Sequence, residues 1–120
     1  MEFTEETFGQ VKVFNLQGKI MGGPETPVMC DHLKTFIDAG TQELVINFRD
    51  VPWVNSDGVG AIIACLTTLR RRGGDVRFAN VHGAVRQYFH ITQLETVIQI
   101  YDRVDEAVAS FAKEKSGSPP

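Results

Sequence analysis

One segment near the middle of the chain carries apolar side chains at helical spacing. Its apolar positions recur at intervals of three and four residues: Val59, Ile62, Ile63, Leu66 and Leu69. This spacing predicts a helix with one buried face, and Gly73 can end it in the left-handed conformation. Just before it, residues 44–48 are apolar with little alternation, as in a strand that is covered on both faces. The strand and the helix should therefore pack together.

Strands and helices alternate along the rest of the chain. Alternating residues at 11–16 predict a strand, which a turn at Gly9 and Gln10 joins to an earlier strand at 3–8. Further elements are predicted as strands at 76–81 and 97–101, a short helix at 84–89, and a last helix with Val104, Ala107, Val108 and Phe111 inward. This order predicts an α/β fold with a central, mostly parallel mixed sheet and interspersed helices.

The first long helix follows a loop that contains Gly22 and Gly23. Its inner face is expected to carry Met29, Leu33, Phe36 and Ile37. We expect Thr26 to cap this helix, with Pro27 at the first helical position and Gly40 at the end. The helix should pack on the same sheet as the central helix.

Composition narrows the function classes. With 120 residues, 42% of them hydrophobic, the chain can bury the core of one ordinary domain, which we place at residues 1–112. The tail at 113–120 has nothing to bury and is expected to be disordered. A net charge of -3 argues against nucleic acid and anionic membranes as partners. Because the sequence has neither a membrane-spanning stretch nor a signal peptide, we expect a cytoplasmic protein with no membrane insertion.

The cysteines and histidines do not suggest a metal site. Cys30 and Cys65 lie beside apolar residues in separate helical patterns, so we interpret them as buried free thiols rather than as a disulfide or a metal pair. His32, His82 and His90 are scattered without the spacing of metal ligands, and we expect them on the surface. The sequence predicts no metal ligand.

Ser56 lies at the start of the central helix, directly after the strand and its connecting loop. Backbone N–H groups at a helix start lack intrahelical partners, and the helix dipole is positive there. A hydroxyl at this position can therefore cap the helix, and a phosphate placed on it would be stabilised. The residues alone leave both interpretations open.

The same segment does not match common catalytic or nucleotide-binding motifs. A serine hydrolase elbow needs a glycine two residues before the nucleophile, where Val54 stands. Gly58 and Gly60 match the beginning of a dinucleotide fingerprint, but Ile63 occupies the position of its third glycine. The lysine of a P-loop is absent as well. We therefore expect a binding module that is not an enzyme and carries no cofactor.

The segment 54–60, Val-Asn-Ser-Asp-Gly-Val-Gly, and the order of the predicted elements resemble the STAS domain of bacterial anti-sigma factor antagonists. The resemblance covers residues 3–112 and includes Gly18 after the second strand and the pair Gly73 and Gly74 after the helix. In that family, a partner that is both anti-sigma factor and serine kinase phosphorylates the first serine of the loop, and a serine phosphatase resets the cycle. The unphosphorylated antagonist binds the kinase and frees the sigma factor. The resemblance implies that Ser56 is the phosphorylated residue.

Three positions depart from the family pattern. Asn55 stands where the family usually has Asp, Asp57 where it has a second Ser or Thr, and Met21 where it often has an acidic residue. Two other interpretations stay open. The chain could be a STAS subunit of a transport or signalling complex in which Ser56 is never phosphorylated, or a small-molecule or nucleotide-binding STAS domain.

The expected partner-binding surface surrounds the start of the central helix. Its residues are Gly22, Gly23, Trp53, Asn55, Ser56, Asp57, Gly58 and Val59. Trp53 is either a lid on the core or an anchor for a partner. Gly58 either allows close packing in the first helical turn or leaves room for a partner to approach. In the second case, a bulky residue at position 58 would weaken partner binding and leave the fold intact.

Overall fold

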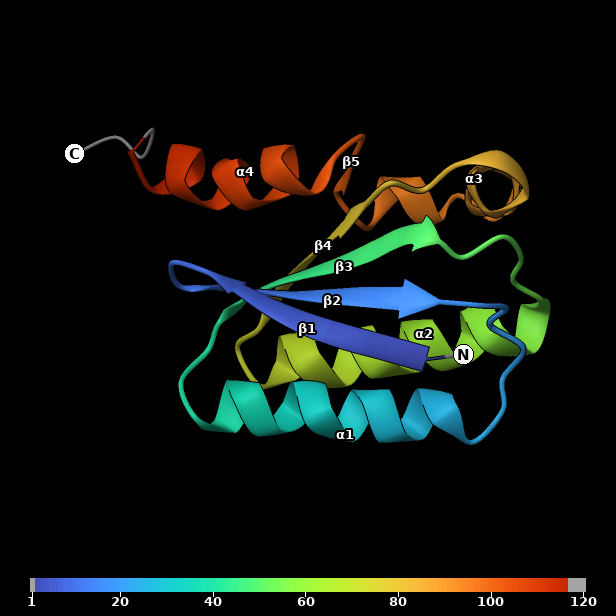
Figure 1. Cartoon of the computed structure of the whole chain (residues 1–120), viewed down its shortest axis with the longest axis horizontal. Helices are drawn as coiled ribbons and strands as arrows, with labels where there is room; N and C mark the ends of the chain where they lie inside the picture. Colours follow the sequence, from blue (N-terminus) through green and yellow to red (C-terminus); the bar gives the residue numbers. More distant parts are fainter. Residues whose placement is uncertain (1, 117–120) are drawn as a thin grey trace.

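A mixed five-stranded sheet forms the centre of the protein (Figure 1). The structure is a computed structural model and describes residues 2–116. The strands follow each other across the sheet in sequence order: β1 (Glu2–Phe8), β2 (Val11–Gln17), β3 (Glu43–Asp50), β4 (Asp75–Ala79) and β5 (Ile100–Tyr101). β1 pairs antiparallel with β2, and the other three pairs are parallel. The predicted α/β fold with a mostly parallel mixed sheet is confirmed.

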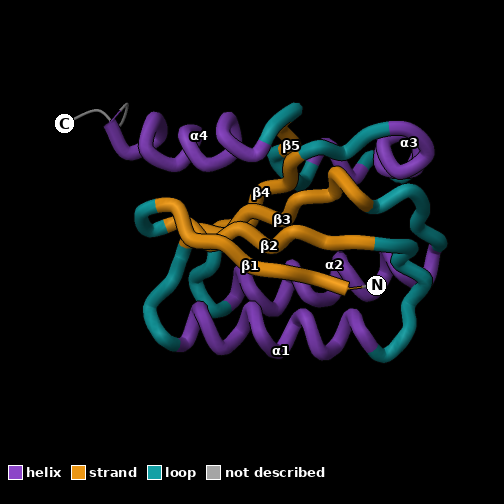
Figure 2. The backbone as a smooth tube through the Cα atoms, viewed as in Figure 1, coloured by secondary structure: helices purple, strands orange, loops and turns teal. Residues whose placement is uncertain are grey.

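Helices cover both faces of this sheet. α1 (Glu25–Asp38) and α2 (Ser56–Arg71) lie side by side on one face, and α4 (Val104–Ser116) lies on the other (Figure 2). α3 (Gly83–Ile91) and the 3-10 turn η1 (Leu94–Thr96) connect β4 to β5. Parallel neighbours need a crossover between them. α1, α2 and α3 supply these crossovers, whereas α4 follows the last strand.

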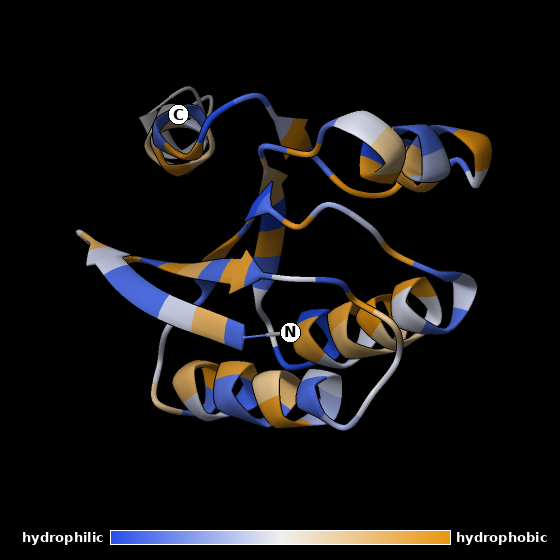
Figure 3. Cartoon of the chain, turned by 45° about the vertical axis from the view of Figure 1, so that its right-hand side comes forward, coloured by the Kyte–Doolittle hydropathy of each residue, from blue (hydrophilic) through white to orange (hydrophobic). Residues whose placement is uncertain are grey.

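The larger core lies between the sheet and the helix pair α1 and α2. Leu44, Ile46 and Phe48 of β3 belong to this core, whereas Val45 of β3 belongs to the core under α4, so β3 is covered on both faces as predicted. The helices carry alternating hydrophobic and hydrophilic bands (Figure 3). Their buried side chains include Met29, Leu33 and Ile37 from α1 and Val59, Ile62, Leu66 and Leu69 from α2.

A smaller core lies under α4. Among the residues whose burial is described, its buried apolar members are Val11, Val13, Val45, Ala79, Ala107 and Phe111. Arg77 is also buried here, with its guanidinium 4.0 Å from the centre of the Phe111 ring. The same guanidinium donates hydrogen bonds to Ser110 and, at 3.1 Å, to Asp75. These contacts offset the cost of removing the charge from water.

Three local predictions differ from the structure. α1 begins at Glu25, and Thr26 is buried in its first turn without capping it. Ile63 is 41% exposed because it lies at the edge of the buried stripe of α2, and Cys65 is buried in its place. α4 is described to Ser116, four residues beyond the predicted domain end at residue 112. Residues 117–120 lie outside the described residues, and disorder there stays a prediction.

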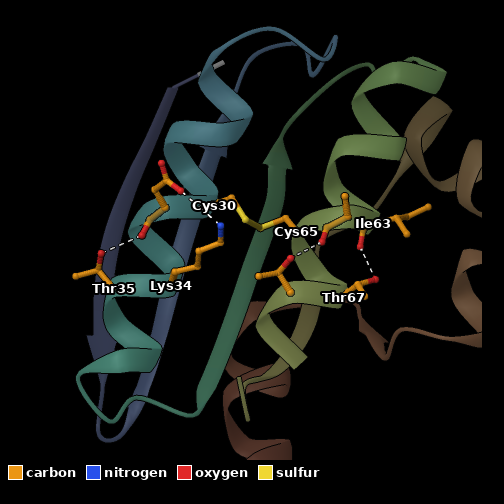
Figure 4. The surroundings of a disulfide bond; sticks show 9 residues. Cys30, Lys34, Thr35, Ile63, Cys65 and Thr67 are labelled. Carbon is orange, nitrogen blue, oxygen red and sulfur yellow. Dashed lines mark hydrogen bonds and ion pairs between the residues drawn. A yellow bond between two sulfur atoms is a disulfide. The ribbon is translucent and has the colours of Figure 1, made fainter. Parts of the chain in front are cut away.

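The prediction of two free thiols is wrong, because Cys30 of α1 and Cys65 of α2 form a disulfide (Figure 4). Their Cα atoms are 5.7 Å apart, which is a usual separation for bridged cysteines. Each cysteine was correctly assigned to a helix, but the sequence does not reveal that the two helices pack with these positions toward each other. Within residues 2–116, no cysteine remains free.

Candidate functional site

Ser56 lies where the chain leaves the sheet and enters α2. The segment before it runs beside the segment that follows β2, and backbone hydrogen bonds join the two. The N–H of Ile20 donates to the carbonyl of Trp53 at 3.0 Å, and the N–H of Asn55 donates to the carbonyl of Ile20 at 3.2 Å. Ile20 and Val54 form a parallel bridge and are both buried. These contacts fix the first turn of α2 relative to the sheet.

Asn55 caps α2. Its side-chain oxygen accepts a hydrogen bond from the N–H of Gly58 at 2.7 Å, and its carbonyl accepts one from the N–H of Val59 at 2.9 Å. Its backbone is extended, with φ -114° and ψ 178°, as is usual for the residue that precedes a helix. Capping was one of the two interpretations of Ser56, and the structure gives that role to the preceding residue.

Ser56 is the first residue of α2, and it is exposed. Among residues 2–116, its hydroxyl has no hydrogen-bond partner, and neither do the backbone N–H groups of Ser56 and Asp57. Asp57 is exposed too and places a carboxylate in the first turn. The Ser56 hydroxyl therefore projects from the positive end of a helix dipole, without a structural task in the fold.

Two glycines allow the segment after β2 to lie against the first turn of α2. A β-carbon at Gly58 would overlap the backbone carbonyl of Ile20, and one at Gly22 would lie 2.8 Å from the β-carbon of Asp57. Gly22 has a φ of 80°, which glycine adopts more easily than other residues. Gly58 and Val59 are buried. The expectation that a bulky residue at position 58 leaves the fold intact is wrong, because it would displace backbone.

Two exposed apolar side chains belong to the two segments that meet at the start of α2. Trp53 is 47% exposed, so it is not a lid on the core, and Met21 is 48% exposed. Exposed aromatic and apolar residues near a polar site are typical of protein interfaces. The sequence analysis noted Met21 only for its departure from a family pattern. In the structure, Met21 is exposed while its neighbour Ile20 is buried, since neighbours in an extended segment face opposite sides.

The predicted partner-binding residues form two adjacent segments, 22–23 and 53–59. Six of them reach the surface at least in part: Gly22, Gly23, Trp53, Asn55, Ser56 and Asp57. The other two, Gly58 and Val59, support the site from inside. Contact of these residues with a partner stays a prediction.

The histidines are engaged in local contacts. His32 meets the Phe3 ring edge-on, and His82 lies 2.9 Å from the carbonyl of Arg49. His90 lies 2.6 Å from a carboxylate oxygen of Glu95. Within residues 2–116, no group of three or more potential ligands is arranged to hold a metal ion. No helix in the same range has both the length and the apolar character that a membrane crossing requires.

A cavity of about 650 Å3 opens on the other face of the sheet, between α4 and the hairpin of β1 and β2. Asn15 and Asn47 line it, and the Asn47 amide donates a hydrogen bond to the Asn15 side-chain oxygen at 2.8 Å. Val104 and Val108 of α4 form its apolar side. The cavity is not at the glycine-rich helix start, and it therefore gives no support to the nucleotide-binding interpretation, which relied on those glycines.

Comparison with known proteins indicates one family. The family model of the STAS domain matches residues 3–107. The anti-sigma-B factor antagonist of Bacillus subtilis (strain 168) is 27% identical, over 62% of this chain and 67% of its own length. The matched regions span 65%, 70% and 67% of three curated relatives.

Two solved structures have the same fold. A putative anti-sigma factor antagonist from Thermotoga maritima superposes with a TM-score of 0.78 at 18% identity, covering 90% of this chain and 92% of that one. The Bacillus cell fate determinant SpoIIAA in its phosphorylated form gives a TM-score of 0.69 at 20% identity, covering 92% and 99%. At these identities the structures establish the fold and no more.

Proposed function

The chain belongs to the STAS domain family, and on this basis we propose that it is an anti-sigma factor antagonist controlled by phosphorylation of Ser56. The unphosphorylated protein binds an anti-sigma factor that is also a serine kinase, and the sigma factor is freed. The kinase then phosphorylates Ser56 and the complex dissociates. A serine phosphatase restores the unphosphorylated form. The protein acts in the cytoplasm as a binding module and not as an enzyme.

The position of the Ser56 hydroxyl carries this proposal. Asn55 supplies the helix cap, so the fold itself does not require a hydroxyl at position 56. The hydroxyl is exposed at a helix start that is held firmly against the sheet, where the active site of a kinase can reach it. Exposed Trp53 and Met21 provide apolar surface for the same partner.

The names of the relatives agree with this assignment. The B. subtilis relative is an anti-sigma-B factor antagonist, and the neighbour SpoIIAA has been solved in a phosphorylated form. The departures at positions 55 and 57 are compatible with the switch. Asn55 keeps the capping hydrogen bond, and Asp57 keeps one negative charge beside the target hydroxyl.

A phosphate on Ser56 should affect the fold and the interface differently. It carries a charge of about -1.5 to -2 at pH 7. Inside the chain, the helix start favours an anion by about 0.3 to 1 kcal/mol, partly offset by repulsion from Asp57. At an interface with a kinase that holds nucleotide phosphates, the same charge must lose water and meet other anions, which can cost several kcal/mol. Phosphorylation should therefore end binding without unfolding the domain.

The proposal is tested by intact mass measurement of the protein isolated from its own cells. We expect a fraction heavier by one phosphate, which disappears in Ser56→Ala and persists in Thr67→Ala. Thr67 is a matched control because it is also exposed on α2, with its hydroxyl bonded to the carbonyl of Ile63 at 3.0 Å. A protein that is never phosphorylated under any growth condition would contradict the switch and favour a STAS subunit of another complex.

A further inference from the structure

The Cys30–Cys65 disulfide joins the two helices on the larger core. The two residues are separated by 35 positions in the sequence, and the bridge crosses from α1 to α2 (Figure 4). The loop that it closes contains β3 and the start of α2, including Ser56. The covalent ring therefore contains the part of the candidate site at residues 53–59, whereas Gly22 and Gly23 lie outside it.

Both bridged helices begin at the candidate site. α1 starts at Glu25, directly after the segment in which Ile20 and Gly22 lie against Gly58 and Asp57. α2 starts at Ser56 itself. A bond between the helices thus restrains the segment 20–24 against the first turn of α2. Without the bond, this arrangement depends only on packing and on backbone hydrogen bonds.

The two sulfur-bearing residues differ in access. Cys65 is 6% exposed, whereas Cys30 is partly exposed. An external thiol or peroxide therefore meets Cys30 first.

The surrounding core should keep the helices in place when the bridge is absent. Met29 and Leu33 of α1 and Ile62 and Leu66 of α2 are all buried in the larger core. Their burial does not depend on the sulfur atoms. The reduced protein is therefore expected to stay folded, with more freedom between the two helix starts.

We propose that Cys30 and Cys65 are a reversible oxidation site that controls how firmly the segment 20–24 is held against the Ser56 helix start. A peroxide oxidises the pair: the Cys30 thiolate takes one oxygen to form a sulfenic acid, and the Cys65 thiol then displaces water to form the disulfide. In total, two thiols and hydrogen peroxide give one disulfide and two waters. A dithiol reverses the step by exchange and becomes a disulfide itself.

This site has a consequence for signalling that rests on the proposed function. The oxidised form presents the exposed residues around Ser56 in one fixed arrangement. A fixed surface loses less freedom when a partner binds. We therefore expect the oxidised, unphosphorylated protein to bind the kinase about tenfold more tightly than the reduced protein, a size usual for coupling between sites.

The first test measures the thiols under native conditions. The purified chain is reduced with dithiothreitol and treated with hydrogen peroxide in its native state. It is then labelled with N-ethylmaleimide in denaturant, so that buried Cys65 is also reached, before intact mass measurement. We expect two labels after reduction, none after peroxide, and two again after a second reduction. Labels that persist after peroxide would overturn the proposal, and so would a disulfide that dithiothreitol reduces only in denaturant.

The second test measures hydrogen exchange of backbone amides. Reduction should speed exchange about threefold to tenfold at the hydrogen-bonded amides of Ile20, Asn55, Gly58 and Val59, because local opening becomes easier. Exchange of the amides between β2 and β3 should stay unchanged. The double variant Cys30→Ser/Cys65→Ser should exchange like the reduced protein with or without dithiothreitol. Equal exchange in the oxidised and reduced chain would show a purely structural bridge, and loss of the circular dichroism spectrum on reduction would also contradict a switch.

These tests do not require a kinase, so their outcome is independent of the proposed function. Phosphorylation of Ser56 in cells can fail while the thiol and exchange results hold, in which case the oxidation site stands and the antagonist function does not. If Ser56 is phosphorylated but exchange is insensitive to reduction, the antagonist function stands and the oxidation control does not.

Discussion

The two faces of the sheet are built very differently. The face toward α1 and α2 carries large apolar side chains along every parallel strand, and it supports the Ser56 helix start. On the face toward α4, polar side chains follow near the ends of β2, β3 and β4. The side-chain amide of Asn80 donates a hydrogen bond to the side-chain oxygen of Asn47 at 2.9 Å, and the amide of Asn47 donates one to Asn15 at 2.8 Å. In the part of the chain that the structure describes, the buried apolar core on this face consists of six residues.

This difference indicates which face gives the protein its stability. Burial of large apolar side chains is the main favourable term in folding, and most of these side chains lie against α1 and α2. The candidate site lies at the end of that face, so the packing of the larger core fixes the position of the Ser56 helix start. Substitutions on the two faces should therefore have unequal costs.

The largest contrast is expected between two phenylalanines. The Phe48 ring lies 4.7 Å from the Phe78 ring and 5.7 Å from the Phe89 ring, measured between centroids. Phe48→Ala should lower the free energy of unfolding by about 3 to 5 kcal/mol. Phe111→Ala, in the smaller core, should cost about 3 kcal/mol, the lower end of the usual range, because α4 can settle into the space. Urea titrations of both variants measure this, and a larger loss for Phe111→Ala would reverse the comparison.

A second contrast concerns two glycines of the same helix. A β-carbon at Gly58 would overlap the Ile20 carbonyl, whereas one at Gly60 would meet nothing within 4 Å. Gly58→Ala should destabilise the protein by about 1 to 3 kcal/mol through overpacking. Gly60→Ala should stabilise it by about 0.5 to 1 kcal/mol, since alanine is the better helix former. Thermal melts of both variants measure these changes in stability. Equal changes for Gly58→Ala and Gly60→Ala would mean that the segment after β2 does not contact α2 closely at position 58.

The smallest contrast is expected between the stability changes of two neighbouring substitutions, at the helix cap Asn55 and at Ser56. Asn55→Ala removes the side chain that accepts from the Gly58 N–H and should cost about 1 kcal/mol. Ser56→Ala should change stability by less than about 0.5 kcal/mol, as expected for an exposed residue without a partner. The order would be inverted if the hydroxyl of Ser56 were the cap in solution.

Periodicity predicted the elements well, but it could not predict contacts between them. The alternation at 11–16 and the apolar run at 44–48 correctly predicted β2 and β3. Burial of a strand on one or both faces determines which of its positions are apolar, so the sequence pattern reveals it. The pairing of Cys30 with Cys65 depends on the rotation and spacing of α1 and α2, which no local pattern records. The thiol prediction failed for this reason.

The candidate site was predicted in its position but not in its details. The strand, loop and helix around Ser56 could be recognised from the sequence. The sequence did not reveal whether Asn55 or Ser56 caps the helix, since both residue types are good caps. The answer depends on the position of the helix start to within one residue. Gly58 left two interpretations as well, and only the nearby Ile20 carbonyl, distant in sequence, distinguishes them.

The central claim is that the Ser56 hydroxyl serves binding and not folding. It is tested most directly by calorimetric titration of the phosphorylated and unphosphorylated protein against the serine kinase that modifies it, with thermal melts of both forms. We predict that phosphorylation weakens binding at least about 100-fold, equivalent to about 2.7 kcal/mol or more, while the melting temperature changes by less than about 2 °C. Ser56→Ala should bind like the unphosphorylated protein and should not be released by ATP. Equal affinity of the two forms would contradict the account.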